Sequence, residues 1–80
     1  MRTFVLQHRH EPDECDATFA SWMGFKSPLR HVSVPSTCLA GGHDLFWTVK
    51  ARDRAAALAL LPPFVARRTR AIQVRAVEIP

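Results

Sequence analysis

Apolar and polar side chains alternate along residues 3–10, TFVLQHRH, and this pattern limits the fold more than any other part of the sequence. Side chains of a β-strand point to opposite faces in turn, so a period of two predicts a strand. Every second residue from Phe4 to His10 lies on one face of it. Pro12 then ends the strand, because proline lacks a backbone N–H and suits the first turn of a helix.

Two segments have helical character. Residues 12–24 place apolar side chains at helical spacing, and Gly24 follows where a left-handed C-terminal cap is expected. The apolar stripe consists of Cys15, Phe19, Trp22 and Met23. Asp53 is a favourable N-cap for a second helix, which is rich in Ala and Leu and is expected to end at Pro62-Pro63.

Three more strands are expected, at residues 32–40, 43–50 and 71–79. The first two flank the turn Gly41-Gly42, which predicts a hairpin. Pro35 removes a ladder hydrogen bond, so the 32–40 strand is expected at an edge of the sheet.

The predicted order is β-α-β-β-α-β, a ferredoxin-like plan with a four-stranded antiparallel sheet and two helices on one face. A chain of 80 residues and 9.0 kDa is expected to form a single domain over residues 1–80. The face expected beneath the helices consists of Phe4, Leu6, Leu45, Trp47, Val49, Ile72 and Val74.

The opposite face of this sheet is expected to mix apolar and charged side chains. It consists of Val5, Gln7, Arg9, Phe46, Thr48, Lys50, Gln73 and Arg75. Such a face either stays in water or packs on a second copy, and a sheet-to-sheet dimer would bury on the order of 800 Å² per partner. Because the core of so small a domain is thin, we expect a homodimer, a dimeric α+β barrel.

The segment from Leu45 to Pro80 resembles the C-terminal half of muconolactone isomerases. The matching residues are Asp53, Leu58, Leu61, Pro62, Phe64, Val74 and Ile79. The resemblance implies the ferredoxin-like fold and sheet-to-sheet oligomers. The acidic and basic active-site residues of that family's first helix have no counterpart in ATFASWMGFKS, so the resemblance extends to the fold and not to the reaction.

Histidines and cysteines form the most suggestive chemical set. His8 and His10 lie two residues apart on one strand face, and imidazole and thiolate ligands suit Zn²⁺, Ni²⁺ or Cu²⁺. Cys15 and His43 are the strongest further metal candidates, and the remaining candidates are Glu11, His31 and Cys38. The alternative is that histidines at a strand end bond only to backbone or water.

Aromatic and basic residues suggest a second kind of site. Trp22 and Trp47 could hold a flat organic ligand, while Arg30 and His31 could bind its acidic group. His8 or His10 could then act as a general acid or base, as in a cofactor-free isomerase or oxygenase. The leading hypothesis is that the protein binds a small acidic or aromatic ligand near the His8/His10 end of the sheet. The alternative is that both tryptophans are core residues.

Charge and hydropathy narrow the function classes. The net charge is +4, yet the open sheet face offers only Phe46 for base stacking, so nucleic acid is not an expected partner. No apolar run reaches 18 residues and the N-terminus does not resemble an export signal. We therefore expect no membrane association, a cytoplasmic location and reduced cysteines.

Overall fold

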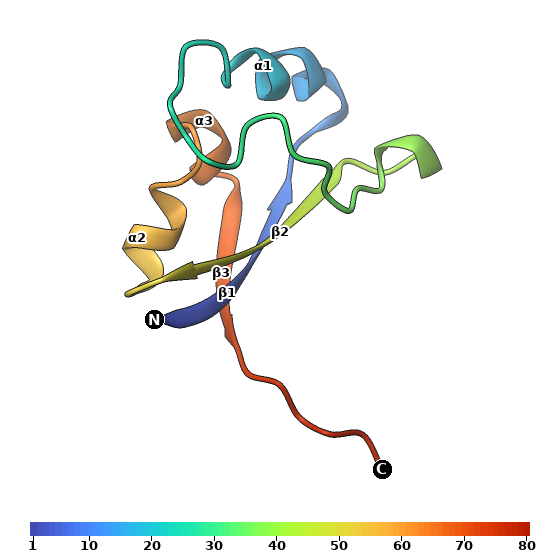
Figure 1. The fold of residues 1–80 in the computed structure, drawn as a ribbon. Coiled ribbons are helices and arrows are strands. Elements are labelled where there is room, and N and C mark those ends of the chain that lie inside the picture. The colour runs from blue at the N-terminus through green and yellow to red at the C-terminus, as the bar shows by residue number, and fades with distance from the viewer.

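The computed structural model describes residues 1–80 as a small antiparallel sheet with short helices at one face and one end (Figure 1). The strands are β1 (Arg2–Arg9), β2 (Asp44–Ala51) and β3 (Thr69–Val74). The α-helices are α1 (Cys15–Ala20), α2 (Arg54–Leu58) and α3 (Pro63–Ala66), and the 3₁₀ turns are η1 (Pro12–Glu14) and η2 (Cys38–Ala40).

The sheet has three strands in the order β2-β1-β3, and β1 is antiparallel to both neighbours. Leu6 lies opposite Trp47 on β2 and opposite Ala71 on β3. All three side chains therefore share one face, which is the buried one. The first strand is thus the centre of the sheet, and its inward residues touch both edges.

Helices α2 and α3 cover this buried face, and α2 packs against all three strands. Asp53 caps α2 by accepting a hydrogen bond of 2.8 Å from the N–H of Ala56. The Pro62-Pro63 pair then separates α2 from α3, since proline at a helix start needs no backbone partner. The core consists of Phe4, Leu6, Leu45, Trp47, Val49, Ala51, Ala57, Leu61, Val65 and Ala71.

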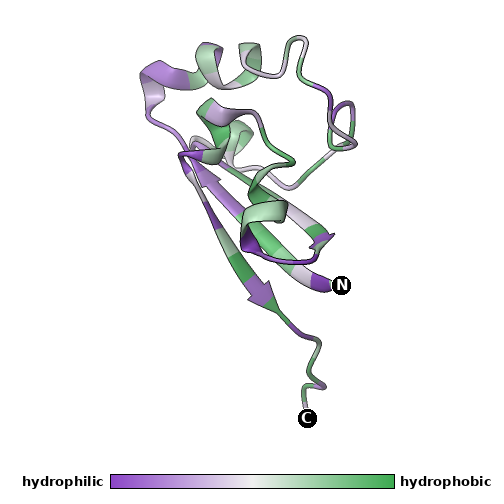
Figure 2. Ribbon diagram, turned by 90° about the vertical axis from the view of Figure 1, so that its left-hand side faces the viewer, coloured by the Kyte–Doolittle hydropathy of each residue, from purple (hydrophilic) through white to green (hydrophobic).

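Helix α1 lies beyond the end of the sheet and does not cover its face (Figure 1, Figure 2). The predicted helix over residues 12–24 is shorter, because η1 and α1 occupy 12–20 and turns follow to Gly24, which has a φ of 74°. The predicted apolar stripe is buried only in part: Trp22 packs against the core, whereas Phe19 and Met23 are exposed, and Thr18 is the buried residue of α1. Placed at the sheet's end, α1 has little apolar surface to cover.

The predicted ferredoxin-like fold is wrong, because residues 32–40 do not form a fourth strand. Only an isolated bridge joins Ser36 to Leu45, supported by two backbone bonds, Thr37 N–H to Asp44 O and Phe46 N–H to Pro35 O. Pro35 offers no donor to extend this pairing, and the chain turns into η2 at Cys38. The predicted dimeric α+β barrel is also wrong, because each protomer of such a barrel has a four-stranded sheet and this chain has a three-stranded one.

The last strand differs from its prediction in length and in facing. The β1–β3 ladder ends where Thr3 meets Val74, so residues 75–80 have no strand beside them and extend away from the sheet (Figure 2). Ile72 lies opposite Val5, so Ile72 and Val74 belong to the outer face and not to the core. The inward residue of β3 is Ala71.

Candidate metal centre

Three side chains from separate segments meet at the end of the sheet nearest α1. His10 follows β1, Cys15 is the first residue of α1, and His43 precedes β2. The Sγ atom of Cys15 lies 3.4 Å from Nε2 of His10 and 3.3 Å from Nδ1 of His43. All three ligand atoms lie within 4.8 Å of one another. In a tetrahedral site with Zn–N near 2.0 Å and Zn–S near 2.3 Å, such N···S pairs are roughly 3.5 Å apart.

Cys15 is held in place by the turn that precedes it. One carboxylate oxygen of Glu14 accepts a 2.9 Å bond from the N–H of Glu11, and the other accepts bonds of 2.7 and 3.1 Å from Arg68. The hydrogen bonds from Arg68 hold the pKa of Glu14 at about 2. Arg68 also bonds to the carbonyl of Phe64 and stacks on its ring, 3.7 Å from the centroid. This chain of contacts fastens η1 and Cys15 to the segment between α3 and β3.

His43 is held by the tight turn before β2. The backbone N–H of His10 donates to the carbonyl of His43 at 3.1 Å, which brings the two ligand segments together. Thr37 bonds to both the N–H and the carboxylate of Asp44, and its carbonyl accepts from Gly42 at 2.8 Å. A Cβ atom on Gly42 would collide with the side chain of Thr37, so only glycine fits before His43 without displacing Thr37.

His8 is completely buried behind His10 and fixes its ring. Nε2 of His8 lies 3.0 Å from Nδ1 of His10, and Nδ1 of His8 lies 3.2 Å from the hydroxyl of Thr69. That hydroxyl donates to the carbonyl of Val65 at 2.7 Å.

The proton positions follow from this chain of bonds. Since the Thr69 hydroxyl donates its only hydrogen to Val65, it must accept from Nδ1–H of His8. Burial lowers the pKa of both His8 and His10, so both rings are neutral at pH 7. A neutral His8 with its proton on Nδ1 accepts from Nδ1–H of His10. The lone pair on Nε2 of His10 is therefore directed at Cys15, as metal ligation requires.

The predicted metal candidates thus separate into three groups. His10, Cys15 and His43 come together, whereas His8 is outside this cluster and is a hydrogen-bonding partner of His10. His31 and Cys38 lie elsewhere, and the Glu11 side chain is not part of the cluster. Sequence reasoning missed Glu14, Arg68 and Thr69, since their roles depend on contacts between distant segments. It also missed Gly42, whose role depends on close approach to Thr37 within one turn.

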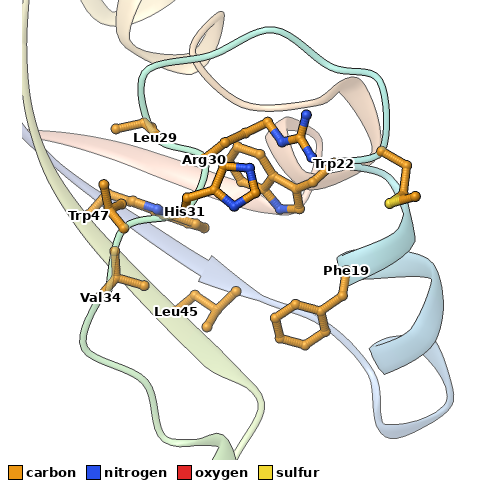
Figure 3. A pocket seen from close by; sticks show the side chains of 10 residues that line it. Phe19, Trp22, Leu29, Arg30, His31, Val34, Leu45 and Trp47 are labelled. Atoms are coloured by element: carbon orange, nitrogen blue, oxygen red, sulfur yellow. The ribbon is translucent and has the colours of Figure 1, made fainter.

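The four predicted ligand-binding residues, Trp22, Arg30, His31 and Trp47, line a separate pocket of about 260 Å³ (Figure 3). Phe19 lies between this pocket and the metal cluster: it lines the pocket, and its ring packs edge-on against His10 with centroids 6.4 Å apart. His8 and His10 do not line the pocket. Their proposed acid–base role there would need a ligand that reaches past Phe19.

Comparison with protein-family models, with curated proteins and with solved structures finds no match to this chain. No helix of the protein has the length and apolar character needed to cross a membrane.

Proposed function

We propose that the protein binds a transition-metal ion of the Zn²⁺ class through Nε2 of His10, Sγ of Cys15 and Nδ1 of His43. The observation that carries the proposal is the position of Cys15 Sγ, 3.4 and 3.3 Å from one nitrogen of each histidine. These ligands come from three segments that are tied together by backbone and side-chain bonds, so the site needs little rearrangement to close on an ion.

The donor set selects the class of metal. A thiolate with two imidazoles suits Zn²⁺, Cu²⁺ and Ni²⁺, whereas Mg²⁺ and Ca²⁺ prefer oxygen ligands. Glu14 and Asp44, which adjoin Cys15 and His43 in the sequence, have other partners, since Glu14 bonds to Arg68 and Asp44 bonds to Thr37. Three protein ligands leave a fourth position for water or an exogenous ligand, which is the pattern of open rather than structural zinc sites.

The surrounding bonds favour the ligating forms of the side chains. His10 is buried and neutral, with its Nδ1–H engaged by His8, so no proton has to leave its Nε2. Because a metal ion binds cysteine as the thiolate, metal binding at Cys15 is expected to release protons. Partners that orient a ligating histidine in this way commonly change metal affinity by 10–100-fold.

The test is a Co²⁺ titration of chelator-treated, reduced protein, followed by absorption spectroscopy. Bound Co²⁺ is expected to give a thiolate-to-metal charge-transfer band that saturates at a single equivalent and disappears when Zn²⁺ is added. Cys15→Ser should remove this band.

Cys38→Ser is the matched control, because Cys38 is the other free cysteine and lies outside the cluster. The control should keep the full band. Absence of the band in the wild-type protein, or its loss in Cys38→Ser with retention in Cys15→Ser, would contradict the proposal.

A further inference from the structure

The pocket beside Phe19 is a second candidate site, independent of the metal cluster. Its walls are apolar, and Trp22 and Trp47 form an aromatic corner with ring centroids 5.9 Å apart and planes tilted by 41° (Figure 3). Its volume is about 260 Å³. A compact one- or two-ring molecule is the size that such a space can take.

Arg30 gives the pocket its charge preference. No Asp or Glu lines the pocket. The ion pairs of the protein use Arg9, Arg52 and Arg68, so the guanidinium of Arg30 has no carboxylate partner. A guanidinium at the border of an apolar pocket presents a planar fork that fits a carboxylate.

The segment that carries Arg30 is built into the fold. The hydroxyl of Ser27 donates to the carbonyl of Leu60 at 2.7 Å and accepts from the N–H of Leu29 at 3.1 Å. His31 has a φ of 64°, a left-handed conformation that is uncommon outside glycine. Such a conformation persists only where its surroundings hold it, and it often marks a ligand-contacting segment.

The pocket also keeps large apolar side chains in contact with water. Phe19, Met23 and Val32 line it, and their exposed fractions are 54%, 77% and 51%. Covering these side chains with an apolar ligand surface would be favourable in proportion to the area removed from water.

We propose that this pocket binds a planar aromatic monocarboxylate. The aromatic part covers the Trp22–Trp47 corner, and the carboxylate pairs with Arg30. This binding does not need the metal, so it can be measured on chelator-treated protein and fails or succeeds separately from the metal centre.

The experiment uses the two indole N–H signals of the protein, since Trp22 and Trp47 are its only tryptophans and both line the pocket. Isotope-labelled protein is titrated with 2-naphthoate and followed by two-dimensional NMR. Both indole signals are expected to shift and saturate. The neutral isostere 2-naphthamide should bind at least about tenfold more weakly, since it lacks the charge-assisted bond to Arg30.

Arg30→Met keeps most of the side-chain length but not the charge. It should weaken the affinity for 2-naphthoate by about tenfold and leave the affinity for 2-naphthamide unchanged. Arg52→Met is the matched control, because Arg52 is exposed and lies outside the pocket, and it should bind like wild type. Absence of saturable indole shifts would overturn the site. Equal affinity for acid and amide, or an unchanged Arg30→Met, would overturn the carboxylate assignment.

Discussion

Replacing His8 with leucine tests whether this buried ring supports the metal ligand His10. The two residues have similar volumes, so the substitution chiefly removes the hydrogen bonds to His10 and Thr69. Each bond contributes about 1 kcal/mol net, and a buried N–H left unsatisfied on His10 costs about 1–3 kcal/mol. We expect metal-free His8→Leu to lose about 2–3 kcal/mol of unfolding free energy. The affinity for Zn²⁺ should fall about 10–100-fold, although all three ligands remain.

Two measurements on the same samples separate stability from metal affinity. Urea denaturation followed by circular dichroism gives the unfolding free energy, and competition with a chromophoric chelator gives the Zn²⁺ affinity. Thr69→Val is a milder companion, because it breaks the chain of bonds one step further from the metal. His31→Asn is the control histidine variant, since it lies in the pocket and asparagine tolerates a positive φ.

Zn²⁺ binding by folded His8→Leu protein within about twofold of wild type would contradict the supporting role of His8. In that case His10 would find its ligating orientation without a partner on Nδ1. A loss of affinity equal in His8→Leu and His31→Asn would likewise remove the assigned role.

Three further outcomes follow from particular contacts. The difference in melting temperature between wild type and Glu14→Gln should be constant above pH 4.5 and should vanish as the pH falls towards about 2. The reason is that the lowered pKa of Glu14 makes its bond to Arg68 stabilising only while the carboxylate is charged. A difference that does not depend on pH would contradict this. Thr18→Val should raise the unfolding free energy by about 1 kcal/mol in urea denaturation, because the buried hydroxyl has no hydrogen-bond partner; a loss of stability would show that the hydroxyl is needed. Gly42→Ala should lower the unfolding free energy by about 1–3 kcal/mol and weaken the Co²⁺ band, because the added methyl group would displace Thr37 beside His43. An unchanged band would show that the turn accommodates the methyl group without moving His43.

Local patterns predicted the strands better than their assembly. The alternation over residues 3–10 corresponds to β1 at Arg2–Arg9, because a period of two is a property of neighbouring residues. The 32–40 segment has strand-like composition, yet Pro35 leaves it only a single bridge. The prediction that Ile72 and Val74 lie on the buried face of the sheet is wrong, because Ala71, and not Ile72, lies opposite Leu6. That register depends on pairing with a distant strand and is not visible in the segment itself.

The candidate metal site shows the same division. Spacing placed His8 and His10 on one strand face, but it could not distinguish the ligand from its supporting partner. The distinction depends on Cys15 and His43 reaching one ring and Thr69 reaching the other. The turn at residues 11–14 is fixed by Arg68, which is far from Glu14 in the sequence. The turn at residues 37–43 is fixed by bonds between Thr37 and Asp44, which no periodic pattern of the sequence indicates.

Phe19 gives the two candidate sites a common wall. Its ring lines the pocket and also packs edge-on against His10. Trimming Phe19 would therefore alter both sites at once. The two sites can be tested separately only with variants of residues that belong to one site alone, such as Arg30 in the pocket and Cys15 in the metal cluster.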